Sequence, residues 1–208
     1  MLEGIHNIIF DLGGVIINLD MERTFTAFRA LAEREDVPLY TLAQQHDLFK
    51  RFEVGAVSPD EFVTELKALM DKPALDKETI HAAWNAMLMD IPAERLALLK
   101  RLKQHYRTYL FSNTNALHFD AFNAYLLQAF NEPNLEPYFH KTYYSHLMGI
   151  RKPDAQAFQQ ILDENGLKAQ ETLFLDDTAG HLLGAEQVGI RTQLITAEQT
   201  IMDIFKHY

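Results

Sequence analysis

The sequence predicts an α/β protein that is built on a parallel β-sheet and carries an additional helical part. In the second half of the chain, short apolar segments alternate with segments of helical periodicity, which is typical of a parallel sheet covered on both faces. The first expected strand is instead separated from the second by a long stretch that has only helical periodicity. A chain of 208 residues, 48% of them hydrophobic, is long enough for one sizeable core with an insertion.

Five short apolar segments are expected to form the strands of the sheet. Each has the length of a buried strand and ends in polar or small residues. The segments are IIF (8–10), TYLF (108–111), KTYYS (141–145), TLFL (172–175) and TQLI (192–195). The segments of helical periodicity that accompany the later strands are 93–104, 116–130, 153–166 and 179–188. The longer connection NEPNLEPYF (131–139) is rich in turn residues and is expected to be a loop.

The stretch between the first two strands is expected to be a small helical bundle. Apolar residues recur at helical spacing in 21–34, 39–53, 59–71 and 76–89, and VSPDEF and DKPALDKET contain typical helix starts. We therefore expect an α/β core domain of residues 1–18 and 90–208, and a helical cap domain of residues 19–89. The alternative is one mixed domain whose helices all pack on the sheet.

One helical segment is unusually aromatic. In HFDAFNAYLLQAF (118–130), the large apolar residues at helical spacing are Phe119, Phe122, Tyr125, Leu126 and Phe130. Such a stripe usually faces the core, and we expect the same here. A dimer face or a contact with the cap is the alternative reading.

Composition excludes several classes of partner and site. The 29 acidic and 19 basic residues give a formal charge of −10, which repels nucleic acids and acidic membrane surfaces. The chain has no cysteine, so any metal must bind oxygen or imidazole. The first residues resemble neither a signal peptide nor a membrane span, and a cytoplasmic protein is expected. Whether it is a monomer or a homodimer stays open.

Polar residues follow the expected strands at the points where the strands end. Ligands collect at the carboxyl ends of the strands in an open parallel sheet. The residues at these ends are Asp11, Ser112, Asn113, Asp176 and Asp177. Each alone could be a turn or capping residue, but their succession on several strand ends indicates a site. Lys152 precedes Pro153, a favoured first residue of a helix, and is expected at the same edge of the sheet.

Three carboxylates at one edge of a sheet need a cation. Asp11, Asp176 and Asp177 would repel one another unless they share a positive charge. Mg²⁺ prefers oxygen ligands and leaves room for a phosphate group. The sequence therefore predicts a Mg²⁺ site at this edge.

The four motifs FDLGGVI, FSNTN, RKP and FLDD resemble, in order, the four motifs of the haloacid dehalogenase-like (HAD) superfamily. The resemblance covers nearly the whole chain and implies a Rossmann-like three-layer sandwich, and the helical insertion resembles the C1-type cap of that superfamily. Within the superfamily, DLG together with FEVGAVSPDEF (52–62) is similar to the branch that holds bacterial α-glucose-1-phosphate phosphatases.

The resemblance also implies roles for single residues. Asp11 would attack phosphorus and become an aspartyl phosphate. Mg²⁺ would bind the Asp11 carboxylate, the backbone carbonyl of Gly13 and the Asp177 carboxylate, with Asp176 bound directly or through water.

The same resemblance implies a phosphate-binding group. Ser112 and the amide of Asn113 would hold phosphate oxygens, and Lys152 would neutralise both the phosphate and the nucleophile. These contributions are positioning and charge stabilisation, which dominate phosphoryl transfer.

The sequence departs from the resemblance at two positions. Gly13 stands where most phosphatases of this superfamily have an aspartate that acts as general acid and base, so this help is missing. Asp20, Glu22 and Glu53 are candidates to replace it. His181 stands where an asparagine is common, and we expect it to be a partly buried helix residue.

The function that these residues favour is a Mg²⁺-dependent phosphatase acting on a small phosphorylated metabolite, with a sugar phosphate as one candidate. A metal-independent dehalogenase is an alternative, but it would leave Asp176 and Asp177 without a purpose. A second alternative is a pseudo-phosphatase that only binds a phosphorylated ligand, for which the missing side chain of Gly13 is the main support.

Overall fold

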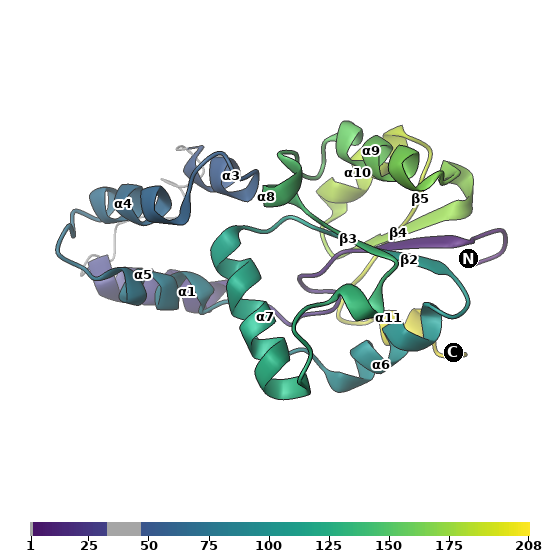
Figure 1. Cartoon of the computed structure of the whole chain (residues 1–208), viewed down its shortest axis with the longest axis horizontal. Coiled ribbons are helices and arrows are strands. Elements are labelled where there is room, and N and C mark those ends of the chain that lie inside the picture. Colours follow the sequence, from purple (N-terminus) through teal and green to yellow (C-terminus); the bar gives the residue numbers. More distant parts are fainter. Residues whose placement is uncertain (1, 33–46) are drawn as a thin grey trace.

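The computed structural model describes residues 2–32 and 47–208 and has a five-stranded, wholly parallel sheet as its centre (Figure 1). The strand order is β3-β2-β1-β4-β5. The strands are β1 (Asn7–Phe10), β2 (Arg107–Ser112), β3 (Lys141–Tyr144), β4 (Thr172–Asp176) and β5 (Arg191–Leu194). All five strands lie where the apolar segments predicted them.

Helices cover both faces of the sheet because its strands are apolar on both sides. Ile8 and Phe10 of β1 pack in one cluster, while Ile9 between them packs in another. The first cluster includes residues of α6 (Ala93–Leu102), α7 (Ala116–Phe130) and α11 (Ile201–Ile204). The second includes residues of α9 (Ala155–Asn165) and α10 (Ala179–Gln187). The core is therefore a three-layer α/β sandwich, as predicted (Figure 1).

The aromatic stripe of α7 packs in the core, as expected. Phe122 and Leu126 are buried, and Phe119 and Tyr125 pack against the same cluster. The segment 131–139 is less open than the expected loop. It contains a short 3₁₀ turn, η1 (Glu136–Tyr138), and buries three of its residues in the core: Leu135, Tyr138 and Phe139.

The start of α9 differs from the expectation. Pro153 is not the first residue of this helix, because Asp154 caps it and its side chain accepts a hydrogen bond from the backbone N–H of Gln156. Lys152 therefore lies in a turn that precedes the helix. A short helix that the sequence did not predict, α8 (Ser145–Met148), follows β3 directly.

The insertion between β1 and α6 is helical, as predicted. Its described helices are α1 (Met21–Ala32), α3 (Leu48–Glu53), α4 (Pro59–Leu69) and α5 (Lys77–Asn85). They bury a separate apolar cluster, which includes Phe28, Phe52, Phe62 and Trp84 and to which α7 contributes Leu117. The parts of the expected helices at 33–34 and 39–46 lie outside the described residues.

Local sequence explains where two of these helices begin. Ser58 forms a capping box with Glu61, and Pro59 is the first residue of α4. Asp76 caps α5 by accepting a hydrogen bond from the N–H of Thr79.

Two connections join the insertion to the sheet, and they run side by side. Leu19 and Leu88 form an antiparallel bridge. The N–H of Asn18 donates to the carbonyl of Asp90 at 3.0 Å, and the N–H of Met89 donates back to Asn18 at 3.0 Å. This pairing explains why α5 ends at Asn85, earlier than the expected 89. Within the described residues, no helix combines the length and the apolarity that crossing a membrane requires.

Candidate active site

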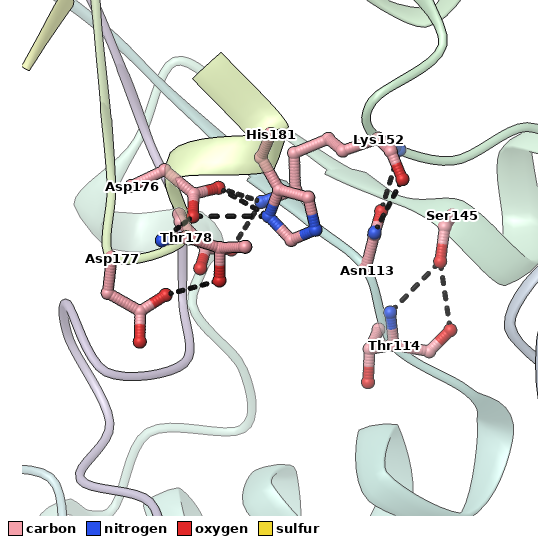
Figure 2. A network of polar contacts seen from close by, with 9 residues as sticks. Asn113, Thr114, Ser145, Lys152, Asp176, Asp177, Thr178 and His181 are labelled. Carbon is pink, nitrogen blue, oxygen red and sulfur yellow. Dashed lines mark hydrogen bonds and ion pairs between the residues drawn. The ribbon is translucent and has the colours of Figure 1, made fainter. Parts of the chain in front are cut away.

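The carboxyl ends of three neighbouring strands bring the expected site residues together. Asp11 directly follows β1, Ser112 ends β2 and Asp176 ends β4. Because β2, β1 and β4 are adjacent and parallel, these ends meet at one edge of the sheet. Lys152 reaches the same place from the loop between α8 and α9 (Figure 2).

Lys152 is completely buried and lies between two carboxylates. Its Nζ atom donates to Asp11 Oδ1 at 2.6 Å and to Asp176 Oδ2 at 2.7 Å. Burial alone would lower the pKa of Lys152, but Asp11 and Asp176 raise it above its ordinary value. The ammonium group therefore stays charged and balances part of the negative charge around it.

The three carboxylates differ in how easily they ionise. Burial and the nearby Asp176 raise the pKa of Asp11 to about 6, against the opposing effect of Lys152. Burial would raise the pKa of Asp176 as well, but Lys152 and His181 hold it below its ordinary value. Burial and Asp176 raise the pKa of Asp177. Lys152 alone thus leaves negative charge uncompensated at this edge, which favours a further cation.

The geometry fits a small cation with oxygen ligands. Asp11, Asp176 and Asp177 each offer an oxygen, and these atoms lie within 4.8 Å of one another. Asp177 comes close to the turn after β1, where Gly14 has a φ of +68° and an added Cβ atom would lie 2.0 Å from Asp177 Oδ2. A glycine is required there by both the backbone conformation and the close carboxylate.

The oxygens of Asp176 are already engaged by the protein. Oδ1 accepts from the N–H of Thr178 at 2.7 Å, and Oδ2 accepts from Lys152 at 2.7 Å. The Nδ1 atom of His181 lies 3.1 and 3.0 Å from the two oxygens. Asp177 is less engaged, because its described side-chain hydrogen bond is the one from Thr178 Oγ1 to Oδ1 at 3.2 Å (Figure 2).

Asn113 holds the backbone of Lys152. Its Nδ2 atom donates to the carbonyl of Lys152 at 3.0 Å, and the N–H of Lys152 donates to Asn113 Oδ1 at 2.9 Å (Figure 2). The next residue, Thr114, is held in the same way by Ser145, which accepts from its N–H and donates to its carbonyl. Ser112 is buried and lines the cavity above the strand ends. Ser112 therefore lines the cavity, whereas the Asn113 side chain is engaged by the backbone of Lys152.

His181 is the site contact that sequence reasoning missed. It is a partly buried residue of α10, as expected, but its ring also contacts Asp176. Its spacing of five residues from Asp176 was a usable signal, since a strand end and the first turn of the next helix lie close together.

The structure separates the three candidates for the missing acid. Glu53 lines the cavity, and its Oε2 atom lies 2.7 Å from Nε of Arg151. Burial raises the pKa of Glu53, although Arg151 opposes this. Asp20 instead caps α1, and Glu22 pairs with Arg29 on an exposed helix face. Among the described residues that line the cavity, Glu53 is therefore the one carboxylate that the insertion contributes.

The cavity lies between the strand ends and the helices of the insertion. Its volume is about 710 Å³. Asp11, Ser112 and Asp177 line the end formed by the sheet, and residues of α1, α3 and α5 line the other end. A molecule held there would contact both parts of the chain.

Known proteins resemble this chain over most of its length. A family model of the haloacid dehalogenase-like hydrolases matches residues 5–189. A D-ribitol-5-phosphate phosphatase of Bacteroides thetaiotaomicron is 29% identical over 188 residues, which are 90% of either chain. A sesquiterpene phosphatase of Aspergillus oryzae is 26% identical over 184 residues, 88% of this chain and 85% of the fungal protein.

Solved structures resemble it as well. A HAD family enzyme of Bacteroides thetaiotaomicron is 35% identical, with a TM-score of 0.86 over 97% of this chain and 98% of that one. The same enzyme has been solved in complex with magnesium and inorganic phosphate, and that structure has a TM-score of 0.83 at 32% identity, covering 97% of this chain and 99% of the other.

Proposed function

This chain belongs to the haloacid dehalogenase-like hydrolases, and we propose that it is a Mg²⁺-dependent phosphatase that cleaves small phosphate monoesters through a phosphorylated Asp11. The observation that carries the proposal is the group of Asp11, Lys152, Asp176 and Asp177 at the strand ends. Two phosphatases among the relatives, and the magnesium and phosphate bound by a similar enzyme, support it.

Asp11 is the proposed nucleophile. One of its carboxylate oxygens attacks phosphorus, the bond to the alcohol oxygen breaks, and an aspartyl phosphate forms. Water then attacks the phosphorus, releases inorganic phosphate and restores the carboxylate. Lys152 holds the Asp11 side chain in place by the hydrogen bond of 2.6 Å. Burial raises the pKa of Asp11, and the charged Lys152 opposes this, so Lys152 favours the ionised form of the attacking carboxylate.

Ser112, the backbone amide of Asn113 and Lys152 are the proposed phosphate-binding groups. Ser112 is buried at the end of β2 and lines the cavity. The Asn113 side chain fixes the backbone of Lys152. This contact holds the Asn113 amide and Lys152 in a fixed position relative to each other. Fixed donors of this kind stabilise the charge on a transferring phosphoryl group.

The proposed Mg²⁺ ligands are Asp11, the carbonyl of Gly13 and Asp177. Asp176 is proposed to act through water, because Lys152, Thr178 and His181 already engage its oxygens. When bound, the ion would supply positive charge to the carboxylates and to the phosphate oxygens.

Residues 19–89 are proposed to form a cap domain that moves relative to the sheet. The paired connections at Asn18 and Asp90 support this, because two adjacent strands can bend together as a hinge. Limited proteolysis with and without Mg²⁺ and a phosphate analogue tests the motion. Unchanged protection of the two connections would contradict it.

A phosphate-release assay with an aryl phosphate tests the main proposal. We expect turnover with Mg²⁺, none with EDTA, and none in Asp11→Asn, which keeps the shape of the side chain. A pseudo-phosphatase predicts no turnover under any condition. A metal-independent dehalogenase predicts no phosphate release and instead release of halide from a 2-haloacid in the presence of EDTA.

The relatives leave the alcohol part of the substrate open. One is named for a polyol phosphate and the other for a terpene phosphate. Their common chemistry is the phosphate monoester, and a sugar phosphate is one candidate within it.

A further inference from the structure

The half of the cavity that lies away from the strand ends is mainly apolar. Its described lining includes six large apolar side chains: Leu19, Met21, Phe25, Phe49, Trp84 and Leu88. In a phosphatase, this half would receive the alcohol part of the monoester, because the phosphate must lie at Asp11. The walls of this half therefore decide which alcohols are accepted.

Three polar side chains on this wall, Thr24, Asn115 and His118, already form hydrogen bonds with Trp84, Met87 or one another. The hydroxyl of Thr24 donates to the carbonyl of Trp84 and accepts from the N–H of Met87. Asn115 Oδ1 accepts from the indole N–H of Trp84 at 3.2 Å, and Asn115 Nδ2 lies 3.1 Å from Nδ1 of His118. Most of their donors and acceptors are thus already used within the protein, which leaves one amide N–H of Asn115 and one lone pair of Thr24 for a substrate hydroxyl.

His118 completes this network and stays neutral within it. Its Nε2 atom donates to the carbonyl of Trp84 at 3.2 Å, and its ring stacks on the indole with centroids 5.0 Å apart. Both ring nitrogens are thus occupied. Trp84 therefore lines the cavity with its indole N–H already donated to Asn115.

The charged groups of this half lie together on one side. Glu53 and Arg151 pair with each other at 2.7 Å, and Lys50 is a largely exposed residue of the same helix as Glu53. Among the described residues of this half, these are the remaining side chains with full charges. They can contact one end of an alcohol but cannot surround a chain of hydroxyl groups.

From this wall we infer that the site selects its alcohol by apolar contact, so that phosphate monoesters of alkyl, aryl or isoprenoid alcohols are better substrates than polyol phosphates of the same length. The inference rests on the proposed phosphatase function. A polyol would lose its water without gaining partners, whereas an apolar chain gains from leaving water. The cavity volume of about 710 Å³ is in the range that holds drug-sized ligands, so the alcohol can be larger than a pentyl chain.

Matched pairs of substrates test this inference. Propyl phosphate is compared with glycerol 3-phosphate, and pentyl phosphate with ribitol 5-phosphate, in the presence of Mg²⁺. All four release a primary alcohol, and the extra hydroxyl groups make the polyols the better leaving groups, so chemistry alone favours the polyols. We expect kcat/KM for the alkyl esters to be at least about tenfold higher. It should also rise roughly fourfold for each added methylene group.

A pair of variants shows whether the wall causes the preference. Met21 and Leu127 are both large apolar residues with exposed surface, but only Met21 lines the cavity. Met21→Gln should lower the ratio of kcat/KM for pentyl phosphate to that for ribitol 5-phosphate by about threefold or more, and Leu127→Gln should leave it unchanged.

The outcomes separate this inference from the proposed function. Equal or higher kcat/KM for the two polyol phosphates, or an equal effect of the two variants, would overturn the apolar selection and leave the phosphatase standing. If none of the four esters and no aryl phosphate is hydrolysed, the proposed function itself fails, and the inference with it.

Discussion

The side chain of Leu19 fills the space beside Gly13: a Cβ atom added at Gly13 would lie 2.5 Å from Leu19 Cδ1. Leu19 belongs to one of the two connections between the sheet and the insertion, and it is 38% exposed. An apolar group therefore lies beside the position where the family resemblance leads us to expect a carboxylate. Because Cδ1 is the end of a flexible side chain, Leu19 can turn toward solvent and make room.

Gly13→Asp is expected to supply the missing acid. Without an acid at position 13, we expect the alcohol of the wild-type reaction to leave largely as an anion, so that kcat/KM depends steeply on the acidity of the leaving alcohol. An acid at position 13 would protonate the departing oxygen and flatten this dependence, with a gain for poor leaving groups of up to about 10²-fold. The measurement is kcat/KM over a series of aryl and alkyl phosphates.

The control for this experiment is Leu19→Ala, alone and combined with Gly13→Asp. Leu19→Ala alone should leave the dependence of kcat/KM on the acidity of the alcohol steep. The combination should weaken this dependence at least as much as Gly13→Asp does. If the chemical step limits the rate in the wild type and kcat/KM depends only weakly on the acidity of the alcohol, another group already protonates the alcohol. Glu53 would then be the first residue to mutate.

Gly14→Ala is expected to weaken Mg²⁺ binding. The new Cβ atom would overlap Asp177 Oδ2, and the φ of +68° is unfavourable for alanine. Asp177 must then shift, which changes the position of its carboxylate relative to Asp11 and Asp176. Calorimetric titration should show a loss of Mg²⁺ affinity of about tenfold or more, since displacing a ligand costs at least about 1.4 kcal/mol.

Gly180→Ala is the matched control. Gly180 lies in α10, has no atom within 4 Å of an added Cβ, and has no positive φ. It should keep the Mg²⁺ affinity and stabilise the helix by up to about 1 kcal/mol. Equal affinity in both variants would remove Asp177 from the proposed ligands.

The sheet and the strand ends could be predicted from sequence because their signal is local. An apolar strand followed by Asp11 or Asp176 is visible in a few residues, and a parallel sheet necessarily gathers such ends at one edge. The family resemblance adds roles to these positions. Lys152 was expected at this edge from a helix start at Pro153, and that start was wrong, since Asp154 provides the cap. The position of Lys152 between Asp11 and Asp176 was not predicted.

The contacts between the insertion and the sheet could not be predicted in the same way. The pairs Glu53–Arg151 and Trp84–Asn115 join segments that are distant in sequence, and they depend on how whole helices pack. Which of Asp20, Glu22 and Glu53 faces the cavity depends on the rotation of α1 and α3. Periodicity identifies a helix, but it does not give the orientation of that helix over a site on another part of the chain.

Lys152→Met is expected to destabilise the fold. The variant leaves Asp11 and Asp176 buried without their shared partner, and breaking a buried ion pair in this way costs about 3–5 kcal/mol. The free energy of unfolding in urea at about pH 8, where carboxylates are normally ionised, measures the loss. Lys168→Met, which removes an exposed pair with Glu171, should change it by less than about 1 kcal/mol. Similar values for the two variants would contradict the proposed role of Lys152 in neutralising the buried carboxylates.

The buried His118 is expected to make the protein less stable in acid. Burial lowers the pKa of His118 to about 4, whereas an unfolded histidine has a pKa of 6.5. Between these values the unfolded state binds a proton that the folded state does not bind, so the free energy of unfolding falls as the pH decreases from 6.5 to 4. The stabilisation that depends on a neutral His118 is fully present above pH 6.5. At pH 4, the free energy of unfolding is lower by about 2–3 kcal/mol because of this residue.

Urea unfolding of the wild type and of His118→Gln at several pH values isolates this effect, because all other titrating groups are shared. Glutamine can still donate to the carbonyl of Trp84 but cannot take up a proton. The variant should be less stable near neutral pH, and the difference between the two proteins should shrink as the pH falls toward 4. His207→Gln, at an exposed position near the C-terminal end of the described chain, should follow the wild type at every pH. A constant difference between wild type and His118→Gln would show that His118 is not held neutral by its burial against Trp84.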